Sequence, residues 1–305
     1  MVRACAAAGD EVIALSRSGA VPDGCGDGLA LDLRDQQSVS TALRDLGPDV
    51  VYHLAALSSV GRSWTDPAQT VQDNVATAIN LLEALRLQAP AARVVWVSTC
   101  EVYGPPASLP LREDAPLQPA NPYAVSKTAG DLLAAVYTSA YQLDIVRARP
   151  FSHSGPGQLP IFILSSIARQ AAEGLIKADG RILIATGNPD TRRDFTDVRD
   201  VVRAYRLLAE RARPGVYNVS SGRSISITEQ VSLVGELVAP VQVEHVVDPE
   251  RVRTNEVMDL RGAHDRLTTA TGWEPEITFQ QTLSDTIEWW TTELAGTPTQ
   301  TAADR

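Results

Sequence analysis

The chain has 305 residues, 44% hydrophobic and 21% charged, which is enough for one large core or two lobes of an ordinary globular protein. This composition excludes a disordered chain, collagen and a coiled coil, and no stretch approaches the roughly 18 uncharged apolar residues that a membrane span needs. The formal net charge of -10 argues against a protein that binds nucleic acid, because the surface offers no net positive field to the phosphates.

The N-terminal residues, the cysteines and the histidines indicate the location of the protein, the redox state of its thiols and whether it has a metal site. No apolar run with a cleavage site follows Met1, so we expect no secretory leader and a cytoplasmic protein. Cys5, Cys25 and Cys100 lack the spacing of a zinc site and the number of a disulfide framework, and we expect them to be reduced. The four histidines are not paired at ligand spacing either. We therefore expect no metal site.

In chain order, the first half alternates short β-branched apolar runs with longer helical patterns, which is typical of βαβ units. Helices are expected from an Asp66-Pro67 cap to about Gln88 and from about Pro122 to Tyr141. The pattern predicts an α/β fold, a doubly wound parallel sheet with ligands at the carboxyl ends of its strands. The expected strands are 11–15, 29–33, 49–55, 93–98 and 143–149.

The first residues do not fit the usual start of such a sheet, which is a strand, a glycine-rich turn and then a helix. Residues 1–9 have the pattern of the back half of that helix, and Glu11 begins what should be the second strand. Gly24, Gly26 and Gly28 precede a strand, so they cannot form the turn. We expect the upstream reading frame to encode the strand and a Gly-x-x-Gly-x-x-Gly turn, and an early in-frame stop codon there would contradict this.

After Pro150 the pattern changes, with glycines and prolines before a helix expected at 161–174. The chain is then expected to return to the first sheet with the segments 197–210 and 215–220. We divide it into a dinucleotide-binding domain (1–160 and 192–222), a smaller C-terminal α/β substrate lobe (161–191 and 223–295) and a frayed tail (296–305).

Tyr123 and Lys127 stand four residues apart in an expected helix, so their side chains share one face. A nearby ammonium favours the phenolate and lowers the phenol pKa from about 10 towards the working pH, which makes tyrosine a proton donor and acceptor. The plain alternative is an exposed helix pair. We favour the catalytic interpretation because the helix follows a strand end that carries hydroxyl groups.

That strand end spans residues 97–104 and carries Thr99 and Glu101. The hydroxyls of Thr99 and Tyr123 can bond one substrate oxygen, and with Lys127 they form a set suited to hydride transfer at a carbonyl or carbinol. Alternatively, Thr99 only closes the strand. Glu101 is either an acid or base or a solvated loop carboxylate, and the sequence leaves both open.

Several segments carry a resemblance to a known family. Tyr-His-Leu-Ala-Ala at 52–56, Asp-Asn-Val at 73–75, the strand end at 97–104, Asn-Pro-Tyr-Ala-Val-Ser-Lys at 121–127 and Arg-Asp-Phe-Thr-Asp-Val at 193–198 resemble the extended short-chain dehydrogenases/reductases, the NAD-dependent epimerase/dehydratase group. Segments 149–158, 216–222 and 260–275 are most similar to the GDP-4-keto-6-deoxy-D-mannose reductases within it. The resemblance implies a Rossmann sheet that here lacks its first strand.

The resemblance also implies roles for individual residues. The catalytic residues would be Thr99, Tyr123 and Lys127, with Glu101 as a further candidate and Asn74 supporting a proton relay. His53 to Ala56 would line the cofactor, Asp32 would touch the adenine, and Pro150 and Phe151 would flank the nicotinamide. The full cofactor set is Ser16, Arg17, Asp32, Leu33, Leu54, Ala55, Ala56, Asn74, Tyr123, Lys127, Pro150 and Phe151.

For the substrate, a nucleotide-diphosphate sugar, the resemblance implies that Arg193 and Arg253 clamp the diphosphate, which suits the fork of arginine. The alternative for each arginine is a surface ion pair. Ser152 departs from the family, since it replaces the usual asparagine. The expected substrate set is Ser58, Ser152, Arg193, Asn218, Arg253 and Glu256.

The cofactor can be argued from the residues that end the second strand. An acidic residue there would bond a ribose 2′-hydroxyl and repel a 2′-phosphate, but this chain has Ser16 and Arg17. They favour NADP(H) over NAD(H), unless Arg17 merely faces solvent.

The sequence thus predicts a reductase that transfers a hydride from NADPH to the C4 keto group of GDP-4-keto-6-deoxy-D-mannose, giving GDP-D-rhamnose. One alternative is a GDP-mannose 4,6-dehydratase or a nucleotide-sugar 4-epimerase. The dehydratase gains support from Glu101 but not from Cys100, which stands where many hexose dehydratases carry aspartate. An alternative of another class is a catalytically silent nucleotide-sugar-binding relic. The resemblance also implies a homodimer that pairs through the helices at 67–88 and 122–141.

Overall fold

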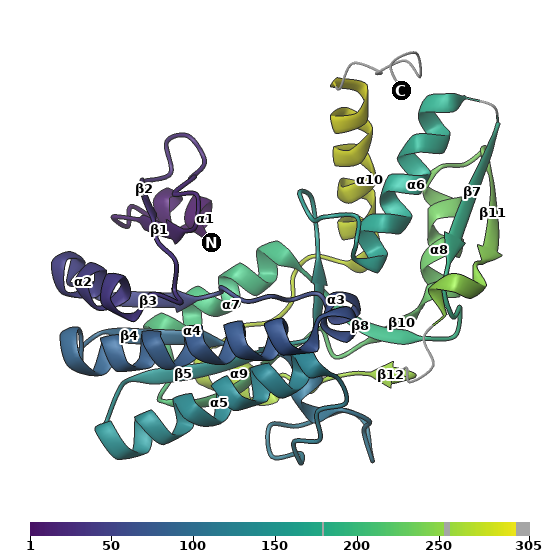
Figure 1. Cartoon of the computed structure of the whole chain (residues 1–305). Helices are drawn as coiled ribbons and strands as arrows, with labels where there is room; N and C mark the ends of the chain where they lie inside the picture. Colours follow the sequence, from purple (N-terminus) through teal and green to yellow (C-terminus); the bar gives the residue numbers. More distant parts are fainter. Residues whose placement is uncertain (179, 253–256, 297–305) are drawn as a thin grey trace.

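The computed structural model describes residues 1–178, 180–252 and 257–296, and it confirms the expected α/β fold (Figure 1). The main sheet is parallel throughout and has the order β3-β4-β5-β9. Its strands lie close to the expected ranges: β3 (Val50–His53), β4 (Arg93–Val97), β5 (Ile145–Pro150) and β9 (Gly215–Val219).

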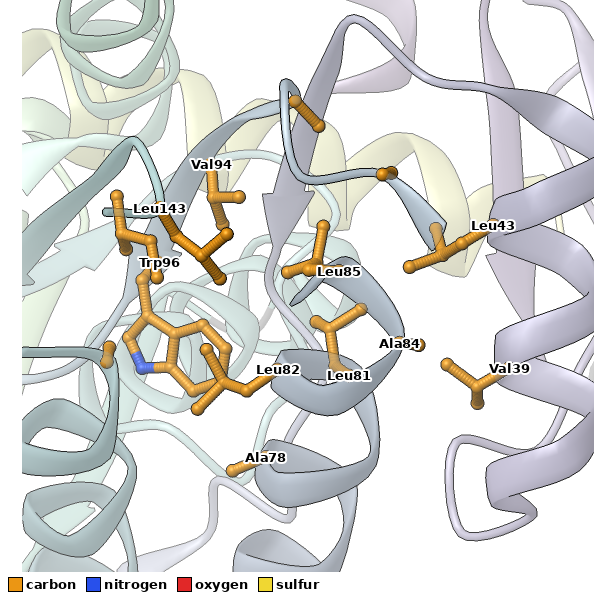
Figure 2. Close-up of a cluster of buried hydrophobic side chains, with 14 residues drawn as sticks. Val39, Leu43, Ala78, Leu81, Leu82, Ala84, Leu85, Val94, Trp96 and Leu143 are labelled. Atoms are coloured by element: carbon orange, nitrogen blue, oxygen red, sulfur yellow. The ribbon is translucent and has the colours of Figure 1, made fainter. Parts of the chain in front are cut away.

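Helices cover both faces of this sheet. Alternate side chains of β4 point to opposite sides, so each face carries apolar side chains that a helix layer buries. Val94 and Trp96 join the core beneath the helices that precede and follow β4, whereas Val95 packs on the other face. Figure 2 shows the first of these cores, which Leu81, Leu82 and Leu85 also enter. The covering helices are α2 (Gln36–Leu46), α4 (Pro67–Gln88) and α5 (Pro122–Tyr141) on one face and α7 (Val198–Arg211) and α9 (Asp265–Thr271) on the other.

The predicted bounds of α4 and α5 are confirmed, and local chemistry explains them. The Asp66 side chain accepts from the Gln69 amide and that of Asn121 from the Ala124 amide, and in each helix a proline follows the cap. These caps satisfy amides that have no partner within the helix, and proline at the first position loses no hydrogen bond. The start of α5 thereby fixes where Tyr123 and Lys127 lie.

The N-terminal segment stands apart from the main sheet (Figure 1). The short helix α1 (Val2–Ala7) agrees with the helical pattern expected there, and β1 (Ile13–Ser16) pairs in parallel only with β2 (Asp27–Ala30). Among the described residues, no strand pairs with the free edge of β1 or with the free edge of β3. Ile13, Leu29 and Val50 remain 37%, 39% and 40% exposed. The sheet is therefore interrupted between β1 and β3, where a first strand was expected to be lacking.

The second lobe is built around β8 (Arg192–Asp197), which pairs with β6 (Ser152–Ser154), β10 (Ser224–Ser226) and β12 (Asp259–Leu260). Of the range 192–222, α7 and β9 join the main sheet and β8 belongs to this second sheet, and the division into two domains stays a prediction. The remaining elements are α3 (Val60–Thr65), η1 (Cys100–Tyr103), α6 (Ile163–Lys177), β7 (Arg181–Thr186), α8 (Ile227–Leu237), β11 (Gln242–Val247), η2 (Pro249–Arg251) and α10 (Phe279–Gly296).

Truncating the core beneath α4 is expected to destabilise the fold. Leu82 is fully buried (Figure 2), so Leu82→Ala should lower the free energy of unfolding by about 3 kcal/mol through lost burial and the cavity left behind. Leu87 lies on the same helix but is 55% exposed, and Leu87→Ala is the matched control with an expected loss below about 1 kcal/mol. Urea denaturation followed by circular dichroism measures both, and equal losses would contradict the assignment of Leu82 to the core.

Candidate active site

Three polar side chains meet where β4 ends and α5 begins. Thr99 directly follows Ser98 at the end of β4, and its hydroxyl is hydrogen-bonded to Tyr123 on α5. Both residues are more than nine-tenths buried. The negative charge of the Glu101 carboxylate contributes to a raised pKa of Tyr123. The same carboxylate accepts a hydrogen bond from the Asn121 side chain at 3.1 Å. The fold thus brings together Thr99, Glu101 and Tyr123, which the sequence places on two separate segments.

The protonation of Tyr123 differs from the expectation. Burial raises the pKa of Tyr123 above its usual value, the Thr99 hydrogen bond opposes this, and Lys127 is not among the groups that shift it. The expectation that Lys127 lowers this pKa is therefore wrong for the structure described here. The reason is geometric, because the Lys127 ammonium donates to the Val97 carbonyl at 2.6 Å. Tyr123 is held as a neutral phenol, which is the form that donates a proton.

Lys127 lies in a largely buried environment beside this group. Burial lowers its pKa to about 8, and the Asp131 carboxylate one turn along α5 partly opposes the shift. Asp131 is itself fully buried and receives hydrogen bonds from Arg147 and Arg149 of β5 at 2.8 to 3.0 Å. These arginines favour the ionised Asp131, whose pKa lies below its usual value despite burial. The α5 helix is thereby locked to the sheet next to Tyr123 and Lys127.

Asn74 ties three segments together around the site. Its side-chain amide donates to the Ser126 hydroxyl at 2.9 Å and to the Leu57 carbonyl at 3.2 Å, and its oxygen accepts from the Leu57 amide at 2.8 Å. These bonds join α4, α5 and the loop after β3. Asn74 therefore fixes the loop expected to line the cofactor.

The other residues expected at the cofactor follow strand ends, with differing exposure. At the end of β1, Ser16 is half-buried, and Arg17 is exposed and has no ion-pair partner among the described residues. Leu54 and Ala55 are exposed beyond β3, and Ala56 is half-buried.

Four expected cofactor residues are engaged elsewhere. Arg34 donates to both Asp32 oxygens and holds the pKa of that carboxyl at about 2, so an adenine contact would share this carboxylate. Leu33 packs against the first core. Pro150 is buried, and Phe151 is 2% exposed and packs in a separate cluster with Tyr103 and Leu260, so only their backbone is available at the end of β5.

The expected substrate residues are more dispersed. Ser58 is exposed, and Ser152 is half-buried on β6. The Arg193 guanidinium donates to the carbonyls of Arg192 and Val257, both at 2.8 Å. Asn218 is fully buried and bonded to Tyr103 and Leu111, so a substrate contact would require these bonds to break. Arg253 and Glu256 lie outside the described residues.

Sequence reasoning missed a buried network that supports this region. The Tyr103 hydroxyl donates to Asn218 at 2.6 Å, and Arg149 reaches the same hydroxyl at 3.1 Å while it holds Asp131. Asp194 accepts from Ser221, Gly222 and Gly262 and so ties β8 to two loops. No spacing rule predicts such long-range pairs, and the two arginines of the otherwise apolar strand β5 were the only signal in the sequence.

A large cavity of about 780 Å³ lies beside the loop after η1, large enough for a small ligand. Its lining residues are 105–109, Ala120 and 257–259. In the described part of the chain, no three His, Cys, Asp or Glu side chains are grouped to hold a metal ion. Of the helices described, none is long and apolar enough to cross a membrane.

Comparison with known proteins gives the family. The family model for GDP-mannose 4,6 dehydratase matches residues 28–286. The chain belongs to this family. It is 39% identical over 262 residues to the GDP-6-deoxy-D-mannose reductase of Pseudomonas aeruginosa, a match that covers 85% of each protein. The family is one of NAD(P)-dependent nucleotide-sugar enzymes, within the extended short-chain dehydrogenases/reductases that the sequence motifs resemble.

Solved structures agree with this membership. The structure of RMD from Pseudomonas aeruginosa complexed with NADPH matches with a TM-score of 0.78 and 38% identity over 86% of each chain. The UDP-glucose 4-epimerase of Thermus thermophilus, in complex with NAD, matches with a TM-score of 0.83 and 29% identity over 95% of this chain and 94% of its own. Similar proteins thus bind either nicotinamide dinucleotide.

Proposed function

We propose that this protein is a reductase that transfers a hydride from NADPH to the C4 keto group of GDP-4-keto-6-deoxy-D-mannose, giving GDP-D-rhamnose. The observation that carries the proposal is the neutral, buried Tyr123 hydrogen-bonded to Thr99 beside Lys127. The bound cofactor supplies the hydride. Thr99 and Tyr123 hold the keto oxygen, and the Tyr123 hydroxyl gives its proton to that oxygen as negative charge develops there.

A 4,6-dehydratase is the second candidate, since the matching family model carries that description. A dehydratase needs an acid for the leaving hydroxyl and a base for C5. At position 100 this chain has a cysteine that is 5% exposed, and burial raises the pKa of its thiol well above the usual value. Such a thiol is a poor proton donor, so Glu101 is the one carboxylate left beside Tyr123 among the described residues. This favours the reductase.

The assay that tests the proposal offers GDP-4-keto-6-deoxymannose with stoichiometric NADPH and follows the loss of NADPH absorbance. We expect consumption in step with the formation of a GDP-6-deoxyhexose. Dehydration of GDP-mannose without net consumption of cofactor would replace the reductase with the dehydratase. The third outcome is that neither reaction and no cofactor binding is found, in this chain or in one extended upstream. That outcome would favour the catalytically silent nucleotide-sugar-binding protein.

We propose NADPH over NADH because Arg17 is an exposed guanidinium that has no described ion-pair partner at the end of β1. Its position suits a ribose 2′-phosphate, and Ser16 beside it can donate a hydrogen bond. Beyond β3, the apolar side chains of Leu54 and Ala55 are exposed and offer a surface to the rest of the dinucleotide.

Arg17→Ala is therefore expected to weaken NADPH binding about tenfold or more while leaving NADH within about twofold, because one charged hydrogen-bonded contact to the 2′-phosphate is lost. Arg44→Ala is the control, since Arg44 is also exposed but is paired with Asp45 on α2. Fluorescence titration of both cofactors measures the constants. Equal weakening of NADPH and NADH by Arg17→Ala would contradict the proposed 2′-phosphate contact.

We also propose a homodimer that pairs through α4 and α5. Leu81, Leu82, Leu85 and Leu133 of these helices face the core, whereas Leu132 and Val136 are 50% and 54% exposed. Ile79, Leu87, Val125 and Tyr141 are further exposed apolar side chains on the two helices. Several exposed apolar side chains on two helices that pack against each other are typical of an interface.

Leu132→Glu should convert the dimer to a monomer of about 33 kDa, because a charge would be buried without a partner. Ile176→Glu is the control, since Ile176 is 47% exposed on α6 in the second lobe. Light scattering at micromolar concentration gives the masses. A wild-type protein that is already a monomer would contradict the interface.

A further inference from the structure

A small cavity lies between strands β3 and β4 and helices α4 and α5, directly beside Lys127. It offers about 10 Å³ to the centre of a water molecule, which is room for roughly one water. Four of the residues that line it have polar side chains: His53, Asn74, Ser126 and Lys127. A cavity that is both polar and large enough for one water is the kind that proteins fill with an ordered water molecule.

His53 brings an unused hydrogen-bonding group to this cavity. The residue is 5% exposed, and its ring contacts the Trp96 ring with 4.4 Å between centroids. None of the residues that the structure describes forms a hydrogen bond with either ring nitrogen. Burial, and then the Lys127 charge, lower the pKa of His53 to about 3, so its imidazole is neutral and one nitrogen is an acceptor. Leaving such a group without a partner would be costly.

Lys127 brings the complementary donors. Its ammonium has three N–H groups, and one of them bonds the Val97 carbonyl. Asn74 and Ser126 have little left to offer, because the Asn74 amide donates to Ser126 and Leu57 while the Ser126 hydroxyl donates to the Tyr123 carbonyl. The unused donors of Lys127 and the acceptor of His53 thus remain on the lining of one cavity.

We propose that this cavity binds one water molecule, which accepts a hydrogen bond from the Lys127 ammonium and donates one to the neutral imidazole of His53. His53 is then a positioning residue that acts on the active site through Lys127. The importance of His53 for turnover rests on the proposed function, in which Lys127 is part of the catalytic group. The binding of the water to Lys127 and His53 does not rest on that function.

The other charged groups around Lys127 are accounted for. Asp131 is the carboxylate that favours the ammonium, and Arg147 and Arg149 hold it from β5. Removing the imidazole acceptor leaves this arrangement intact. The charged form of Lys127 then loses the hydrogen bond to the water. The pKa of Lys127 should therefore fall below its wild-type value.

The experiment uses nuclear magnetic resonance of protein labelled with ¹³Cε-lysine, without cofactor or substrate. The chain contains only two lysines, so Lys127 and the exposed Lys177 give two signals, and Lys177 serves as the control within each sample. Lys127 should titrate near pH 8 in the wild type. The variants are His53→Phe, which keeps a ring against Trp96 but has no acceptor, and His53→Gln, which restores one.

A third variant keeps both partners and displaces the water. Gly130 lines the cavity from α5, and a Cβ there would lie 3.3 Å from Trp96 and 3.7 Å from Ala78, so Gly130→Ala adds a methyl group with only slight adjustment. It also removes a glycine from a helix, so the fold should be retained. This variant keeps the test decisive if His53→Phe does not fold.

We expect the Lys127 titration to move down by about one pH unit in His53→Phe and Gly130→Ala and to return towards the wild type in His53→Gln. The Lys177 signal should not move. An unchanged Lys127 titration in both His53→Phe and Gly130→Ala overturns the proposal, and a shift in His53→Phe alone overturns the water. Because no turnover is measured, these outcomes are independent of whether the protein is a reductase.

Discussion

Tyr123→Phe is expected to reduce turnover at least about 100-fold with little change in cofactor binding. The substitution removes one hydroxyl and keeps the ring in its buried place at the start of α5. In the structure that hydroxyl is hydrogen-bonded to Thr99, and burial keeps it protonated at neutral pH. The variant therefore lacks the group that we propose as the proton donor to the reduced carbonyl oxygen.

Tyr137→Phe is the matched control on the same helix. Tyr137 bonds the Glu83 side chain on α4, away from the end of β4, so turnover should stay within about twofold. Stopped-flow or steady-state absorbance of NADPH gives turnover, and fluorescence quenching gives the cofactor constant. Full activity of Tyr123→Phe in both the reductase and the dehydratase assay would contradict its catalytic assignment.

The sequence predicts the regular part of this fold well because local rules govern it. Caps at Asp66 and Asn121 followed by proline specify where α4 and α5 start, and β-branched apolar runs specify β3, β4 and β5. The pairing of β1 is a different matter. Its only partner among the described strands is β2, and the resulting shift of β2 from 29–33 to Asp27–Ala30 depends on which strands lie beside it. That is a tertiary effect that no local pattern carries.

The site was predictable as a set of residues but not as an electrostatic environment. The four-residue spacing of Tyr123 and Lys127 and the hydroxyl of Thr99 are visible in the sequence, and the fold brings them to one end of the sheet. The Val97 carbonyl that takes the Lys127 ammonium is not visible, nor is the burial that raises the Tyr123 pKa. A helical spacing fixes the face a side chain shares, whereas its pKa depends on depth and on partners from other elements.

Lys127→Met is expected to lower turnover at least about 100-fold and to change the shape of the pH profile. Burial lowers the pKa of Lys127 to about 8 in the folded protein. If the ammonium is the active form, the wild-type turnover rate is at its maximum well below pH 8 and falls as the pH rises through this value. The Met variant lacks this ammonium, and the raised pKa of Tyr123 keeps the phenol protonated, so its residual turnover should show no decline near pH 8.

The fold should survive this substitution. Asp131, the carboxylate whose charge favours the Lys127 ammonium, keeps its bonds to Arg147 and Arg149. Methionine fills the space of the lysine stem. Lys177→Met is the control, since it removes the other lysine, which is exposed at the end of α6. Its turnover and its decline near pH 8 should match the wild type. A decline near pH 8 that persists in Lys127→Met would assign that titration to another group and would remove Lys127 from the proposed chemistry.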